Sequence, residues 1–161
     1  MATVILPERL GYKLRAKAEE TGYLPEELGV ELISQGLREE LDPEDLVEHY
    51  KRLSEKYLVE AKELLEKDDL VQASEKFWGA TALTVKMLAA KRGLTLEQHG
   101  GLWDFVSRLA RETRDKAIIS SFSEANSLHK NFYENELTRE VVEKMAEDVE
   151  QLIVKLKEER E

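Results

Sequence analysis

The sequence predicts an all-α protein: an up-and-down antiparallel helical bundle preceded by a short strand and two helices. Apolar residues recur at helical spacing along most of the 161 residues. Each of the three prolines stands where a helix could begin, a position that tolerates the missing N–H group. Short turns separate the long amphipathic segments, and helices joined in this way pack as antiparallel neighbours.

The first 41 residues differ in pattern from the rest. Residues 3–6 form a short segment that is rich in β-branched side chains, which predicts a strand. Pro7 then opens a helix that we expect to end near Glu20, before Gly22. A second helix is predicted from Pro25 to about Glu40.

We place a boundary at Leu41-Asp42-Pro43. Residues 1–41 are then an N-terminal arm, a candidate dimerisation unit, and residues 42–161 are the bundle. The first bundle helix is predicted from Pro43 to about Lys67, with Asp42 as its cap.

The predicted helix over residues 70–92 differs from the others because it leaves little polar surface. A helix that is apolar nearly all round is expected in the centre of a bundle. Three further amphipathic helices follow, over about 95–112, 116–134 and 138–160. The first of these begins with a capping-box pattern at residues 95–98.

Composition excludes several classes of protein and of site. The longest apolar runs are shorter than the ~18 residues of a membrane helix, the N-terminus lacks a signal-peptide pattern, and cysteine is absent. We therefore expect a cytoplasmic protein with no membrane partner. The three histidines have no metal-ligand spacing, and no nucleotide-loop or nucleophile motif is present, so we expect no metal and no cofactor. Few Asn and Gln with abundant Glu and Lys is typical of a thermophile.

The net charge of −10 disfavours general binding to nucleic acids, because phosphate contacts supply much of that affinity. The charge is uneven, however: residues 71–133 carry nine basic and six acidic side chains. A local basic cleft for a nucleotide or RNA therefore stays open as a hypothesis beside ordinary surface charge.

The predicted helix over residues 116–134 carries the best candidate site. At 100° per residue, His129 falls on the apolar face of this helix, and Asn126 and Tyr133 flank it. Histidine titrates near neutrality and can act as an acid or a base. The alternative is a core histidine that is hydrogen-bonded to its neighbours. Candidate neighbours from other helices are Lys76, Trp78, Arg108 and Arg111.

Two blocks resemble the archaeal PaREP-type family of the HEPN superfamily. They are VQASEKFWGA at 71–80, continued by VK at 85–86 and AKRG at 90–93, and LHKNFYE at 128–134. The resemblance covers about residues 43–158 and implies an up-and-down helical bundle that often dimerises.

Many HEPN proteins are metal-independent ribonucleases whose motif is an arginine, four to six residues, and a histidine. His129 matches the histidine, but the permitted arginine positions hold Phe122, Ser123 and Glu124. The resemblance therefore implies a non-catalytic module that dimerises and binds a nucleotide, RNA or protein partner. A ribonuclease that uses His129 with another cation is the first alternative.

The N-terminal arm resembles a ribbon–helix–helix unit, on the evidence of VILPE at 4–8, AEETG at 18–22 and EEL at 26–28. This resemblance implies pairing of strands from two chains, so we expect a homodimer or a higher even oligomer. A DNA-binding regulator is the second alternative, which charge disfavours. The strand has no Lys or Arg, and Glu26 and Glu27 occupy the helix start where a phosphate would bind.

Overall fold

The computed structural model confirms an all-α fold in the part of the chain that it describes, residues 2–96 and 99–159, without the side chains of residues 99 and 100. Its helices are α1 (Glu8–Thr21), α2 (Pro25–Leu37), α3 (Pro43–Glu66), α4 (Leu70–Lys91), α5 (His99–Thr113), α6 (Ala117–Glu134) and α7 (Arg139–Glu158). None of the helices in these ranges is long and apolar enough to cross a membrane.

The predicted strand over residues 3–6 is wrong for the single chain. Residues 2–7 form no strand, and Val4 and Ile5 are 63% and 91% exposed. A strand exists only when a neighbouring strand accepts and donates its backbone hydrogen bonds. The described part of this chain offers no such neighbour, so local β-propensity is not realised.

Helix ends agree with the expected positions except at the C-terminus of α2 and the N-terminus of α5. α2 ends at Leu37, before the expected Glu40, because Arg38 adopts a left-handed conformation with φ 56°. The Arg38 N–H donates to the carbonyl groups of Ser34 and Gln35 and closes the helix there. The predicted capping box at residues 95–98 depends on residues 97 and 98, which lie outside the described residues.

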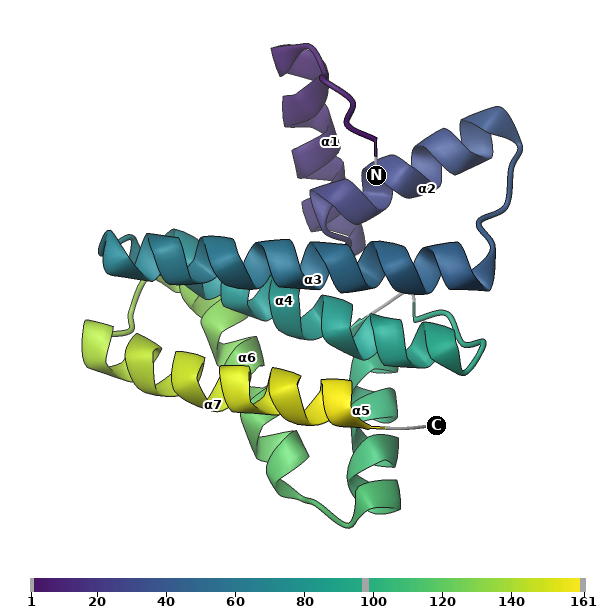
Figure 1. Cartoon of the computed structure of the whole chain (residues 1–161). Helices are drawn as coiled ribbons and strands as arrows, with labels where there is room; N and C mark the ends of the chain where they lie inside the picture. The colour runs from purple at the N-terminus through teal and green to yellow at the C-terminus, as the bar shows by residue number, and fades with distance from the viewer. Residues whose placement is uncertain (1, 97–98, 160–161) are drawn as a thin grey trace.

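α4 is the central helix of the bundle, as its apolar sequence predicted. Sixteen of its 22 residues are buried. α3 covers one side of it, and α6 and α7 pack against it from the other side (Figure 1). The close approach of α3 depends on Gly79, where an added Cβ would lie 2.4 Å from Cδ2 of Tyr57.

The N-terminal arm, residues 2–41, diverges from the bundle. α1 and α2 lie on the side of α3 that faces away from α7 (Figure 1), and the arm is fixed to the bundle near the α1–α2 turn. There Ala18, Leu24, Glu27 and Leu28 are buried, whereas most other residues of the arm are exposed. This divergence leaves an open groove between the arm and the bundle.

Candidate functional site

The groove between the arm and the bundle is the candidate functional site in the described residues. Its volume is about 1360 Å³, above the ~300–1,000 Å³ of typical small-molecule pockets. α1 and α2 form one wall, with apolar side chains such as Leu14, Ile33 and Leu37, and α3, α4 and α6 form the other. A groove of this size and form is suited to a segment of a macromolecule.

His129 of α6 lies in the groove wall at the centre of a polar and aromatic cluster. Its Nδ1 lies 2.8 Å from Oε2 of Glu75 on α4, and both side chains are about one-fifth exposed. The His129 ring stacks on Trp78 with ring centroids 5.0 Å apart, and Tyr133 meets it edge-on at 5.5 Å. The imidazole is therefore held in one orientation by three side chains.

Burial and neighbouring charges shift the pKa values of titratable side chains in the groove wall. Burial raises the pKa of Glu75, and the hydrogen bond from His129 opposes that shift. The Glu19 carboxylate of α1 adds to the rise in the pKa of Glu75. Farther along the groove, burial lowers the pKa of His49. The Nε2 atom of His49 is buried without a hydrogen-bond partner among the described residues.

The structure brings together four of the seven predicted site residues. His129, Tyr133, Lys76 and Trp78 line the groove. Asn126, Arg108 and Arg111 are not among the described residues that line it.

Two cations that sequence analysis placed near His129 are engaged elsewhere. Arg108 Nε donates to Glu112 at 2.9 Å, within α5. Lys76 Nζ pairs with Glu60 at 2.7 Å and lies 4.1 Å above the Tyr57 ring. Neither side chain is therefore available beside His129 without breaking an existing contact.

Glu75, the hydrogen-bond partner of His129, was not among the residues predicted from the sequence. The expected partners were Asn126 and Tyr133, on the same helix. A carboxylate in the mostly apolar helix α4, three residues before Trp78, was the available signal. Acidic residues are rarely buried without a partner, so this position required one.

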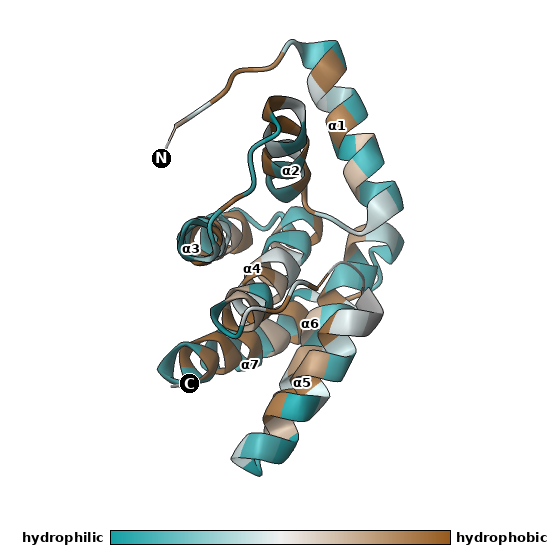
Figure 2. Ribbon diagram, turned by 90° about the vertical axis from the view of Figure 1, so that its right-hand side faces the viewer, coloured by the Kyte–Doolittle hydropathy of each residue, from teal (hydrophilic) through white to brown (hydrophobic). Residues whose placement is uncertain are grey.

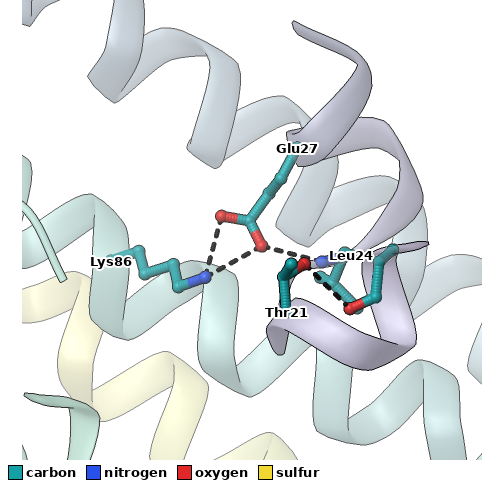
Figure 3. A network of polar contacts seen from close by, with 5 residues as sticks. Thr21, Leu24, Glu27 and Lys86 are labelled. Atoms are coloured by element: carbon teal, nitrogen blue, oxygen red, sulfur yellow. Dashed lines mark hydrogen bonds and ion pairs between the residues drawn. The ribbon is translucent and has the colours of Figure 1, made fainter. Parts of the chain in front are cut away.

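A second polar contact that sequence analysis missed joins the arm to the bundle. Glu27 of α2 and Lys86 of α4 form an ion pair whose side chains are only 2% and 6% exposed. Lys86 Nζ lies 2.8 Å from both carboxylate oxygens, and the Leu24 backbone N–H donates to Oε1 at 3.0 Å (Figure 3). The signal was a single lysine in the apolar run LTVKMLAA, residues 83–90.

The groove is acidic, in contrast to the basic cleft that the charge of residues 71–133 left open. Eight acidic and four basic side chains line it. Lys76 and Lys86 are the basic residues from 71–133 within that described lining, and both are ion-paired. The remaining cations of that stretch lie elsewhere on the bundle. The described residues also contain no group of three His, Asp or Glu side chains that could hold a metal ion.

Comparisons with known proteins find one family and a solved structure that match part of the chain. Residues 49–153 match the model of the archaeal PaREP1/PaREP8 family. The chain is also similar to the crystal structure of a protein from Sulfolobus solfataricus, with 29% identity and a TM-score of 0.58. That alignment covers 65% of this chain and 92% of the Sulfolobus chain. A search of curated proteins finds no significant match.

Proposed function

Because the chain belongs to the archaeal PaREP1/PaREP8 family, we propose that it is a non-catalytic helical module of HEPN type. In this proposal the module dimerises through its N-terminal arm and binds a protein segment in the groove beside His129. The family match begins at residue 49, which is consistent with an arm that is separate from the bundle and ends near residue 41.

The geometry of His129 carries the non-catalytic part of this proposal. Cleavage of RNA without metal needs a group that moves a proton and a cation that stabilises the phosphorane. The Nδ1 atom of His129 instead forms a hydrogen bond with the Glu75 carboxylate at 2.8 Å, and Trp78 stacks on the imidazole ring. No arginine lies among the described groove residues of α4 or α6. The carboxylate of Glu75 would also oppose a phosphate at this position.

The charge and chemistry of the groove favour a protein segment over RNA or a nucleotide. An RNA site would concentrate cations to neutralise phosphates. This groove has twice as many acidic as basic side chains, eight against four, and apolar walls. A partly apolar protein segment that carries basic side chains would complement both the acidic charge and the apolar walls of the groove.

A ribonuclease is the second candidate, and one observation favours it. Lys76 lines the same groove as His129 and is the cation that could replace the missing arginine. For this role Lys76 would have to leave Glu60. The DNA-regulator hypothesis has no comparable support, because the exposed segment at residues 2–7 has no basic side chain.

The test is an RNA cleavage and binding assay. Structured and unstructured RNA are incubated without metal at neutral pH with the wild-type protein, His129→Ala and, as a matched control, His49→Ala. We expect no cleavage by any of the three proteins and only weak, salt-sensitive binding. Cleavage that is lost in His129→Ala and retained in His49→Ala would replace our proposal with the ribonuclease hypothesis.

A further inference from the structure

Exposed apolar side chains are concentrated on the N-terminal arm. Nine of the fifteen large apolar side chains that are well exposed in the described residues belong to residues 4–41. Figure 2 shows this as brown segments on α1, on α2 and in the chain before α1. Monomeric proteins rarely expose contiguous apolar patches of this kind. The arm therefore has the composition of a surface that another element covers.

α2 offers an apolar face that the described chain covers only in part. Leu32, Ile33 and Leu37 are 48%, 48% and 68% exposed. Gly36 lies between them, and a Cβ added there would meet no atom within 4 Å. A second helix can therefore approach this face closely.

α1 is a helix that needs more packing than its own chain provides. It has 14 residues and buries only Ala18, while Leu10 and Tyr12 are 52% and 69% exposed. Helices of this length are marginal in water without tertiary contacts. α1 thus supplies a second apolar face that is left without a neighbour.

The charges of α2 and of the first half of α1 are complementary, because residues 8–15 carry three basic side chains and one acidic side chain, and Glu19 and Glu20 lie near the other end of α1. On α1, Arg9, Lys13 and Arg15 form no ion pair within the described residues. α2 contains acidic residues and no basic one, and its Glu31 accepts a hydrogen bond from the side-chain amide of Gln35 at 3.3 Å. Pairing α2 with another α2 would bring like charges together, whereas pairing α1 with α2 brings opposite charges together.

We propose that α1 of a second copy packs on the exposed face of α2, with Arg9 and Lys13 directed toward Glu31. The two copies exchange this contact reciprocally, so each supplies one α1 and one α2 to the interface. The inference rests on the proposed dimer. In it, α1 of the second copy occupies the end of the groove that is formed by the arm, where Ile33 and Leu37 lie. Residues 2–7 of the second copy would then lie beside the same apolar face.

Charge reversal tests this arrangement in the full-length chain by analytical ultracentrifugation. The α1 variant is Arg9→Glu/Lys13→Glu, and the α2 variant is Glu31→Lys/Gln35→Lys. These positions lie outside the buried core, so both variants should keep the helical circular dichroism spectrum of the wild type. Lys91→Glu/Lys130→Glu on the bundle is the control, with the same change in net charge as the α1 variant.

We expect a wild-type dimer and a dissociation constant raised about tenfold or more in each arm variant. The control should dimerise like the wild type. An equimolar mixture of the two arm variants should form a heterodimer, because each reversed helix then faces an opposite charge. A monomeric wild-type protein would refute both this interface and the dimer in the proposed function. A wild-type dimer that both arm variants leave unchanged would refute the interface alone.

Discussion

Replacement of Lys86 by methionine should separate the arm from the bundle more readily than any other single change in polar contacts. Methionine keeps most of the length and apolar volume of the lysine side chain but removes its charge. Glu27 then keeps the 3.0 Å hydrogen bond from the Leu24 backbone N–H. Its carboxylate, 2% exposed in the wild type, is left buried without a cation.

Removal of one partner from a buried ion pair costs roughly 3–5 kcal/mol, because the remaining charge stays desolvated. We expect about 3 kcal/mol for Lys86→Met, at the low end, since Leu24 still donates to Glu27. Replacing both partners, as in Glu27→Leu/Lys86→Met, removes the unpaired charge. The double variant should therefore lose only about 1 kcal/mol, the usual value of the helix-cap contact that Glu27 makes with Leu24.

Urea unfolding followed by circular dichroism measures the free energy of each variant. Hydrogen exchange at the amides of α1 and α2 shows whether the arm opens before the bundle unfolds. Lys62→Met is the matched control, because the Lys62–Glu150 pair is 3.5 Å long with side chains 52% and 36% exposed. Exposed pairs contribute at most about 1 kcal/mol. A cost for Lys86→Met no greater than that for Lys62→Met would refute our account of the buried pair.

Two further substitutions test the bundle itself. Gly79→Ala should destabilise the protein by about 1–3 kcal/mol in urea unfolding, because the new methyl group meets Tyr57 at 2.4 Å. Gly101→Ala, where the nearest atom is 3.8 Å away, should be neutral or stabilising, and equal losses in both would contradict the packing argument. Burial and the nearby Asp148 carboxylate raise the pKa of Glu124 to about 7, so the folded state binds this proton more tightly than the unfolded chain. The contribution of Glu124 to stability is therefore complete below its ordinary pKa of 4.5 and is lost as the pH rises through about 7. Glu124→Gln should flatten this decline in unfolding experiments across the same pH range, and an unchanged slope would contradict the assignment.

The candidate site could be predicted from the sequence only in part. The position of His129 on the apolar face of its helix placed it beside α4, and Trp78 is indeed stacked on it. Its hydrogen-bond partner Glu75, however, lies 54 residues away along the chain. The contact depends on how α4 and α6 are rotated about their axes, which side-chain spacing within either helix does not specify.

The helical segments and the identity of the central helix could be predicted from local sequence patterns. Helical periodicity and caps are local properties, and α4 could be recognised because an apolar surface on all sides requires burial on all sides. The same reasoning failed for residues 3–6, since a strand is defined by a partner and not by its own residues.

The charge and chemistry of the groove depend on how the helices pack. The basic residues of 71–133 left a local positive cleft open as a hypothesis, but Lys86 is paired with Glu27, 59 residues earlier, and Lys76 with Glu60. The remaining cations of that stretch are not among the described residues that line the groove. Net charge along a sequence is a sum over residues, whereas the field in a groove depends on which side chains face it and which are paired. Helix packing determines which side chains face the groove and which are paired. In this protein, helices from a stretch with net positive charge therefore contribute to one wall of a groove whose charged residues are mostly acidic.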